Sequence, residues 1–272
     1  MQNPAIIING HQTETISSLD RGLLYGDGVF ETVAVKQGKL IHWSDHLERL
    51  EAGCKALNIC GLDTSVLEEE VQLILETNAS QENCVVKIII TRGVGGRGYK
   101  PSKQALTRIV QRFPWSENPA SYLDAGVKVT LCEFRLSQQS RLAKIKHLNR
   151  LEQVLARSEW DDEFQEGLVC DENNNIIEAT SSNVFFQLDD KLITPDLSST
   201  GVAGVMRKNI IEYCRLNDIA VEIRSFKLSE VSQIQAMFLC NSINAIWPVQ
   251  SYCEQKLGKT AIIDQLVAVF NS

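Results

Sequence analysis

The chain has 272 residues, of which 44% are hydrophobic and 22% are charged, so it is a globular protein long enough for two domains of ordinary size. Its net charge of −7 argues against a nucleic-acid binder, and the lack of a long apolar run or a signal-peptide pattern argues against a membrane or secreted protein. The eight cysteines form no C-x-x-C pair and no cluster with histidine, which predicts free thiols in the cytoplasm.

Residues 1–113 predict a small α+β domain. The expected strands are Ala5–Asn9, Val29–Val35, Lys39–Trp43, Cys84–Thr91 and Leu106–Phe113, of which the second and third form a hairpin. A helix capped by Ser44 is expected to bury Leu47, Leu50, Cys54 and Leu57. A second helix begins near Ser65, which has capping-box spacing with Glu68, and runs to about Asn78.

Residues 114–122 (PWSENPASY) contain two prolines, two serines and no apolar periodicity, so they predict a linker. Residues 123–272 predict a larger, strand-rich domain. The expected strands are Gly126–Phe134, Gly167–Asp171, Asn183–Leu188, Ala220–Phe226 and Ala236–Asn241. The expected helices are His147–Trp160, Arg207–Leu216 and Thr260–Phe270.

Lys146 is the first candidate for chemistry. It precedes apolar residues at Leu148, Leu151, Val154 and Leu155, whose spacing predicts the buried face of a helix and places the lysine at a junction of a strand and a helix. A lysine held away from bulk water can act as a Schiff-base nucleophile or a proton shuttle. The alternative is an ordinary surface lysine beside a helix start.

A glycine-rich segment at residues 93–98 (GVGGRG) follows the strand Cys84–Thr91 and formally satisfies G-x-G-x-x-G. No helix opens after it, so the dinucleotide-binding interpretation fails. Two interpretations stay open. One is a flexible hairpin loop, and the other is a mobile loop that presents Arg92, Arg97 and Tyr99 to an anion.

Three further segments could bind an anion. Arg49 is either a solvated helix arginine or a bidentate clamp for phosphate or carboxylate. Residues 200–207 (TGVAGVMR) form either a plain helix start or a turn whose N–H groups cradle a phosphate. Asn241 and Ser242, just after a strand, could add a side-chain donor to that phosphate.

Glu178 follows two isoleucines and precedes small residues, so it is either a rim glutamate or the partner of a cation such as a pyridinium nitrogen. The four histidines have no metal-ligand spacing, so no metal is expected.

Taken together, these residues resemble the fold-type IV pyridoxal-phosphate enzymes, the group that contains the branched-chain and D-amino-acid aminotransferases. The motifs that carry the resemblance are residues 20–22 (DRG), 25–32 (YGDGVFET), 46–50 (HLERL), 145–146 (IK) and 178–183 (EATSSN). A more specific likeness is to the 4-amino-4-deoxychorismate lyases of folate synthesis, through residues 92–99 (RGVGGRGY) and 145–153 (IKHLNRLEQ). The likeness runs from about Ile8 to Val249.

The resemblance implies pyridoxal 5′-phosphate as the cofactor and a fold with a strand-rich pseudobarrel in the larger domain. By it, Lys146 forms the Schiff base and Glu178 pairs with the pyridine nitrogen. The residues that hold the phosphate are Arg49, Val205 and Met206 through their N–H groups, and Ser242 through its hydroxyl.

For the substrate, the resemblance implies binding by Phe30, Arg97 and Tyr99, and Thr32 is the candidate acid. Ala34 stands where many relatives carry an arginine, so other contacts from that strand stay open. The expected reaction converts 4-amino-4-deoxychorismate to 4-aminobenzoate and pyruvate.

The first alternative is a D-amino-acid or branched-chain aminotransferase on the same scaffold, and the second is a non-catalytic pyridoxal-phosphate binding module. The resemblance also implies a homodimer, with a loop of one chain reaching the site of the other.

Overall fold

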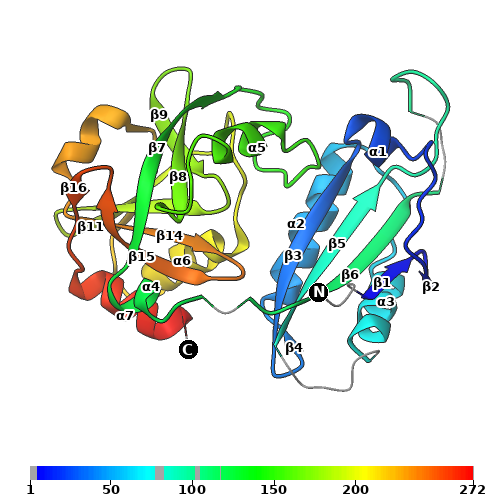
Figure 1. Ribbon diagram of the computed structural model, residues 1–272, viewed down its shortest axis with the longest axis horizontal. Coiled ribbons are helices and arrows are strands. Elements are labelled where there is room, and N and C mark those ends of the chain that lie inside the picture. The colour runs from blue at the N-terminus through cyan, green and yellow to red at the C-terminus, as the bar shows by residue number, and fades with distance from the viewer. Residues whose placement is uncertain (1–4, 77–82, 102–104, 117, 272) are drawn as a thin grey trace. The chain divides into compact units, whose positions relative to one another are not determined.

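The computed structural model describes residues 5–76, 83–101, 105–116 and 118–271 (Figure 1). The chain divides into two compact units. Unit 1 comprises residues 1–116 together with 145–149, and unit 2 comprises residues 117–144 together with 150–272. The five residues that contain Lys146 therefore belong to unit 1, although the sequence analysis grouped them with the larger domain.

Unit 1 is built on a six-stranded antiparallel sheet with the order β2-β1-β6-β5-β3-β4. The strands are β1 (Ala5–Ile8), β2 (His11–Gln12), β3 (Gly28–Lys36), β4 (Lys39–Leu40), β5 (Cys84–Thr91) and β6 (Thr107–Pro114). The helices are α1 (Arg21–Tyr25), α2 (Trp43–Ala56) and α3 (Thr64–Glu76).

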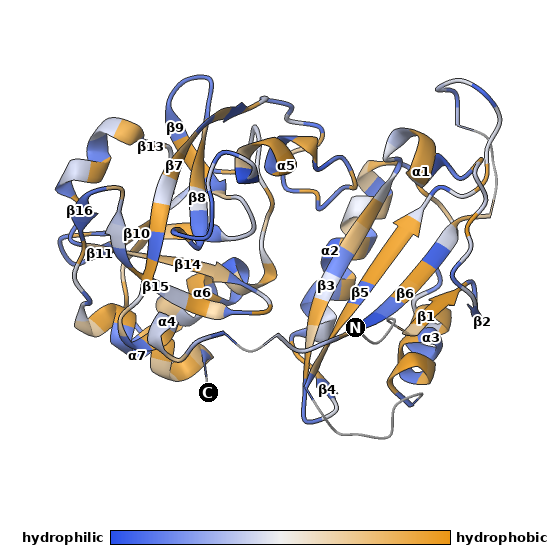
Figure 2. Ribbon diagram, in the orientation of Figure 1, coloured by the Kyte–Doolittle hydropathy of each residue, from blue (hydrophilic) through white to orange (hydrophobic). Residues whose placement is uncertain are grey.

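One face of this sheet is covered by helices, because α2 packs on β3 while α3 packs on β1 and β6 (Figure 1). Strand β5 alternates accordingly: Val86, Ile88 and Ile90 are fully buried, while Lys87 and Ile89 on the opposite face are half-buried. Figure 2 shows how strongly hydrophobic β5 is along its length. Burial of this apolar layer at about 25 cal/mol per Å² holds the unit together.

Unit 2 contains a ten-stranded mixed sheet with the order β12-β11-β10-β14-β15-β7-β8-β9-β13, and β16 pairs with β15. The strands are β7 (Val127–Leu136), β8 (Glu166–Asp171), β9 (Asn175–Ala179), β10 (Asn183–Leu188), β11 (Lys191–Pro195), β12 (Val221–Arg224), β13 (Phe226–Lys227), β14 (Ala236–Asn241), β15 (Ala245–Tyr252) and β16 (Gln255–Lys256). The helices are α4 (Ser121–Asp124), α5 (Leu151–Arg157), α6 (Val205–Leu216), the 3₁₀ helix η1 (Leu228–Gln233) and α7 (Ala261–Phe270).

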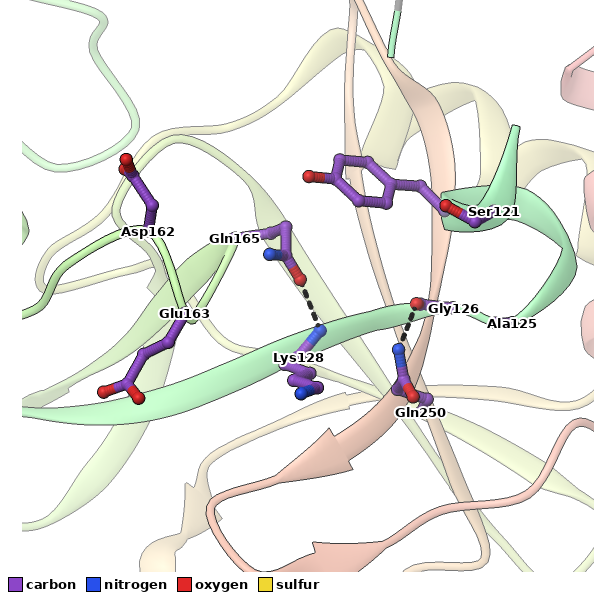
Figure 3. Close-up of a pocket in the computed structure, with 9 residues that line it drawn as sticks. Ser121, Ala125, Gly126, Lys128, Asp162, Glu163, Gln165 and Gln250 are labelled. Carbon is purple, nitrogen blue, oxygen red and sulfur yellow. Dashed lines mark hydrogen bonds between the residues drawn. The ribbon is translucent and has the colours of Figure 1, made fainter. Parts of the chain in front are cut away.

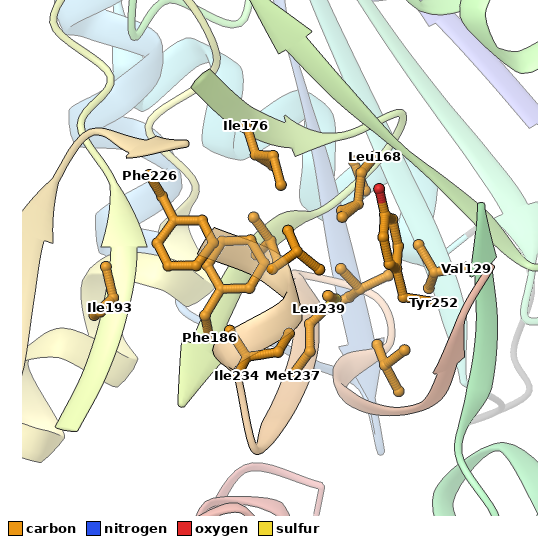
Figure 4. Packing of buried hydrophobic residues seen from close by; sticks show 14 of the residues in the cluster. Val129, Leu168, Ile176, Phe186, Ile193, Phe226, Ile234, Met237, Leu239 and Tyr252 are labelled. Carbon is orange, nitrogen blue, oxygen red and sulfur yellow. The ribbon is translucent and has the colours of Figure 1, made fainter. Parts of the chain in front are cut away.

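The central core of unit 2 lies among strands that are buried on both faces. Phe186 of β10 stacks on Phe226 of β13 with ring centroids 4.0 Å apart, and Leu168, Ile176 and Met237 pack around them (Figure 4). Helices α6 and α7 cover a second cluster on β14 and β15. The two sheets confirm the predicted α+β class. No helix among the described residues is long and apolar enough to cross a membrane.

Several expected element boundaries are wrong. Helix α2 begins at Trp43, and its N-cap is His42 in a left-handed conformation, so Ser44 lies inside the helix. Helix α3 begins at Thr64, where Asp63 rather than Ser65 accepts hydrogen bonds from the first turn, and its expected end at Asn78 lies outside the described residues. The helix expected at His147–Trp160 is confined to α5.

Candidate active site

Lys146 lies in an extended segment that continues the hydrogen bonding of β3. Its carbonyl accepts from the Phe30 N–H at 2.9 Å, and the Leu148 N–H donates to the Gly28 carbonyl at 3.0 Å. The half-buried Lys146 side chain places its Nζ 4.6 Å from the centre of the Phe30 ring. The lysine is thus positioned by β3 and not by a helix start, which corrects the prediction from spacing.

Close packing at Gly28 fixes this segment against the sheet. A Cβ on Gly28 would lie 2.4 Å from the Ile90 carbonyl oxygen and 2.7 Å from Cδ1 of Leu148, so no larger residue fits there. The segment around Lys146 is therefore held against β3 by backbone hydrogen bonds and by the packing of Leu148 on Gly28.

Phe30 and Thr32 lie on the sheet face opposite α2, and a second lysine joins them there. Lys87 of β5 pairs directly with Thr32, and its Nζ lies 5.5 Å from the centre of the Phe30 ring. The Phe30 ring therefore has an ammonium group near it from each of two lysines. Lys87 was missed by the sequence analysis, although it is the one charged residue in an otherwise uncharged predicted strand.

Arg49 of α2 points at the sheet, where Glu31 of β3 receives it. Its Nε donates to Oε1 at 2.7 Å and its Nη2 to Oε2 at 2.5 Å, and His46 Nδ1 lies 2.7 Å from the same Oε2. Glu31 and His46 are each 1% exposed. Arg49 is therefore a held guanidinium and not a solvated surface arginine, and Glu31 is its unpredicted partner.

The glycine-rich loop is tied to α1 by Arg21. This buried arginine donates to the carbonyls of Gly98 and Tyr99 and to Asp27, and its guanidinium stacks on Tyr25. The Tyr99 side chain is 86% exposed and its ring contacts that of Tyr25 with centroids 5.5 Å apart. Arg97, the other predicted binding residue of this loop, is also exposed.

Arg92 was grouped with Arg97 and Tyr99 as a possible anion-binding residue, but its side chain is taken up by contacts within the protein. Its side chain donates to both carboxylate oxygens of Asp27 at 2.7 and 2.9 Å and to the carbonyls of Leu57 and Asn58. Burial raises the pKa of Asp27, but the hydrogen bonds and charges of Arg92 and Arg21 outweigh it and hold that pKa below its usual value. Arg92 therefore anchors the base of the loop.

In unit 2, Glu178 lies in β9 and is 5% exposed. Its Oε2 accepts from the Val202 N–H at 2.8 Å. The preceding residue, Gly201, has φ +88, and a Cβ there would lie 2.7–2.8 Å from Leu197 and Ile177. The turn that meets Glu178 therefore requires glycine. A buried carboxylate in this setting suits a cationic partner.

Val205 and Met206 are the first two residues of α6, and both side chains are buried. The N-cap residue, Gly204, has no side chain to cap this helix, and the first turn holds no acidic residue, so its N–H groups form a positive end suited to an anion. A Cβ on the N-cap residue Gly204 would lie 1.9 Å from Asn183 Oδ1. This turn therefore has no room for a side chain at its cap.

Ser242 is half-buried in the turn between β14 and β15. Its neighbour Asn241 builds that turn, because its Oδ1 accepts from the N–H groups of Ile243 and Asn244 at 2.9 and 2.8 Å. Asn241 Nδ2 also donates to Ser182 Oγ at 3.1 Å. Asn241 is thus a turn-forming residue, and Ser242 is the side chain that the turn presents.

Glu166 of β8 fastens the turn that follows Glu178. This buried carboxylate accepts from the hydroxyls of Thr180, Ser181 and Ser182. Burial raises the pKa of Glu166 in spite of those hydrogen bonds. The sequence analysis missed Glu166, since nothing in its neighbourhood along the chain shows that three hydroxyls converge on it.

One open pocket of about 360 Å³ lies on unit 2 (Figure 3). It is lined mainly by polar side chains. Gln165 accepts from the Lys128 N–H at 2.9 Å, and Gln250 donates to the Gly126 carbonyl at 2.7 Å. None of the predicted site residues lines it, so it is not the candidate active site.

The residues present fit pyridoxal phosphate on three observations. Lys146 offers a half-buried amine next to an aromatic ring, α6 offers an uncapped N-terminus without acidic residues in its first turn, and Glu178 offers a buried carboxylate. Lys146 and Arg49 come from unit 1, while Glu178, α6 and Ser242 come from unit 2.

The chain is similar to an aminodeoxychorismate lyase of Vibrio harveyi, with 37% identity over 245 residues, which are 89% of each chain. It is similar to the crystal structure of 4-amino-4-deoxychorismate lyase from Pseudomonas aeruginosa, with 38% identity, a TM-score of 0.91 and coverage of 98% of this chain and 100% of that one.

A branched-chain aminotransferase of T.th., solved with pyridoxamine 5′-phosphate, has a TM-score of 0.86 at 19% identity over 97% of this chain and 92% of that one, which shows a shared fold. The profile of the family described as amino-transferase class IV matches residues 28–252. The chain therefore belongs to the class IV aminotransferase family, as its motifs predicted.

Proposed function

We propose that the protein is a pyridoxal-phosphate-dependent lyase that converts 4-amino-4-deoxychorismate to 4-aminobenzoate and pyruvate. The observation that carries this proposal is the pair of relatives at 37% and 38% identity, both aminodeoxychorismate lyases matched over 89% and 100% of their lengths. The reaction needs no second substrate, since the two products together contain every atom of the substrate.

Five residues, named by the resemblance, would hold the cofactor together with Lys146. Lys146 would bind its aldehyde carbon covalently, and Arg49 would bind its phosphate with the N–H groups of Val205 and Met206 and the hydroxyl of Ser242. Glu178 would keep the pyridine nitrogen protonated. The cofactor supplies an electron sink for the charge left when a proton leaves the amine-bearing carbon.

Lys146 would then carry the proton. Its amine would accept the proton from the amine-bearing carbon of the substrate. The bond from the ring carbon to the enolpyruvyl oxygen breaks, and the enolpyruvyl group takes up one proton to leave as pyruvate. Thr32 lies about 7 Å along β3 from Phe30 on the same face, by the usual strand rise, and is the candidate donor of that proton.

The substrate carries two carboxylates, and cationic side chains of unit 1 would bind them. Arg97 and Tyr99 are exposed on the glycine-rich loop, whose backbone is fixed by Arg21. Lys87 adds an ammonium group beside Phe30. A chain with a net charge of −7 needs such a local concentration of positive charge to bind a dianion.

The second candidate is an aminotransferase, and it is favoured by the family profile itself, which is named for that activity and matches residues 28–252. It would share Lys146 and Glu178 but would need a keto-acid acceptor. The deciding experiment incubates the cofactor-loaded protein with 4-amino-4-deoxychorismate alone and measures 4-aminobenzoate and pyruvate.

Parallel reactions contain D-alanine or a branched-chain amino acid with 2-oxoglutarate. The lyase predicts equal amounts of the two products without any keto acid. Turnover only in the parallel reactions would replace the lyase with an aminotransferase, and cofactor absorbance without turnover in any reaction would indicate a binding module.

We also propose a homodimer in the cytoplasm. Exposed apolar side chains gather around α1, where Leu19, Leu23, Leu24, Val94 and Tyr99 are 43–86% exposed. Such a patch favours burial against another chain.

All eight cysteines are free, six of them buried, as suits a reducing compartment.

Light scattering on the eluting protein tests the dimer and should give about twice the chain mass of 30.4 kDa. Leu23→Glu should shift the mass toward the monomer, while Leu73→Glu, at a comparably exposed position on α3, should not. A monomeric wild-type protein would contradict the dimer.

A further inference from the structure

Glu31 is a carboxylate in an apolar layer. It lies in β3 between Val29 and Val33, on the face that α2 covers, and is 1% exposed. Placing a charge there is costly, and replacing a buried ion pair by hydrophobic residues of similar size is often neutral or stabilising. Stability of the fold alone therefore does not account for a glutamate at this position.

The contacts of Glu31 account better for a glutamate at this position. Together they restrain the side chain of Arg49. Arg49 Nε and Nη2 meet the two carboxylate oxygens at 2.7 and 2.5 Å, which is the bidentate geometry that fixes a guanidinium plane. His46, one helical turn before Arg49 on α2, holds the carboxylate from its other side through Nδ1 at 2.7 Å.

The contacts of Glu31 favour its ionised form. Burial raises the pKa of Glu31, but the hydrogen bonds from Arg49 and His46 and their charges outweigh it and hold that pKa below its usual value. An ionised carboxylate can only accept, so His46 Nδ1 carries a proton and donates it. His46 Nε2 is buried and has no hydrogen-bond partner among the described residues. His46 therefore acts as a hydrogen-bond donor to Glu31.

We propose that Glu31, braced by His46, is a positioning residue that sets the Arg49 guanidinium to receive the cofactor phosphate. This inference deepens the proposed function and rests on it, since the phosphate role of Arg49 is part of that proposal. Glu31 does not touch the phosphate. Its own charge repels a phosphate, so orientation and charge act in opposite directions and can be separated by measurement.

The experiment compares pyridoxal phosphate with pyridoxal, which lacks the phosphate. The dissociation constant of each is measured on the cofactor-free protein from its visible absorbance, and their ratio gives the phosphate contribution. Glu31→Gln should reduce that contribution about 10- to 100-fold, the factor that one hydrogen bond to a charged group supplies. Affinity for pyridoxal itself should not change.

Glu31→Asp separates orientation from charge, because it keeps the charge but withdraws it by one methylene group. Positioning predicts a loss of the phosphate contribution in this variant as well, and a pure charge effect predicts none. Its measurement also covers the case in which Glu31→Gln does not fold.

The matched control is Glu70→Gln. Glu70 of α3 makes an equally bidentate pair with Arg108 at 2.8 and 2.9 Å, on the same covered face of the sheet. It should lower stability as Glu31→Gln does but leave the phosphate contribution unchanged.

Arg49→Lys separates the positioning role of Glu31 from the phosphate-binding role of Arg49. If it reduces the phosphate contribution and neither Glu31 variant does, the positioning role is refuted while the phosphate role of Arg49 stands. If Arg49→Lys has no effect, the phosphate role fails, and positioning fails with it. A larger phosphate contribution in Glu31→Gln would show that Glu31 acts through its charge, and would overturn the inference.

Discussion

Gly204 offers a sharp test of the turn that leads into α6. Its backbone angles, φ −65 and ψ 139, are ordinary for alanine, so Gly204→Ala introduces no backbone strain. The new Cβ would instead lie 1.9 Å from Asn183 Oδ1 and 3.1 Å from its Cγ. Asn183 must move away, and its Nδ2 then loses its hydrogen bond to the Val202 carbonyl at 2.9 Å.

The cost follows from these two effects. Overpacking of a buried site costs about 1–3 kcal/mol, and the lost hydrogen bond about 0.5–1.5 kcal/mol. The free energy of unfolding should therefore fall by about 2–4 kcal/mol. The N–H groups of Val205 and Met206 should shift at the same time, so affinity for pyridoxal phosphate should fall as well.

Urea unfolding of the cofactor-free protein, followed by circular dichroism, measures the first effect, and cofactor titration measures the second. The control is Gly258→Ala in the same unit, where the nearest atom to a new Cβ is 4.0 Å away, and it should change stability by less than about 0.5 kcal/mol. Asn183→Ala should largely relieve the Gly204→Ala variant. A Gly204→Ala protein with unchanged stability and unchanged cofactor affinity would refute the packing described here.

Four further variants have expected outcomes. Lys146→Ala should abolish both the visible cofactor absorbance and turnover, while Lys87→Ala should keep the absorbance and raise KM. A Lys146→Ala protein that retains either property would show that the amine is misplaced. Because the pKa of Glu31 is lowered, its stabilising contribution is present above its ordinary value of 4.5 and is lost as the pH falls, so Glu31→Gln should flatten the loss of stability in acid. Because burial raises the pKa of Glu166, its contribution is largest at low pH and declines as the pH rises through its folded pKa. Glu166→Gln should therefore flatten that decline, and urea midpoints across a pH series would reveal both effects or their absence.

The sequence predicted best where one face of an element is buried. Strand β5 matches its expected bounds of Cys84–Thr91, because β-branched residues fill most of it. Helix α7, expected at Thr260–Phe270, spans Ala261–Phe270, and Thr260 is its N-cap, since the Thr260 hydroxyl accepts from the Ile263 N–H.

The helix expected after Lys146 shows why spacing can mislead. Leu148 has the helical offset from Leu151, Val154 and Leu155, but it packs against Gly28 in unit 1. The other three side chains belong to α5 and are 52–75% exposed. The apparent helical periodicity therefore combined a residue of unit 1 with three residues of unit 2. The sequence alone does not show that these residues lie in different units.

Strands β9, β11 and β15 were not expected for a different reason. Strands β9 and β11 have five residues each, which is short for a periodic pattern, and Pro248 within β15 is unusual inside a strand. The partners of the site residues were equally hidden. Arg49 and Glu31 are 18 positions apart in the chain, and no local pattern records that their side chains meet.

The most direct test of the account is to find which amine carries the cofactor. The protein loaded with pyridoxal phosphate is reduced with borohydride, which makes the link permanent, and the modified peptide is identified by mass spectrometry. We expect a single modification, on Lys146. Modification of Lys87 or Lys144 instead, or none at all, would contradict it.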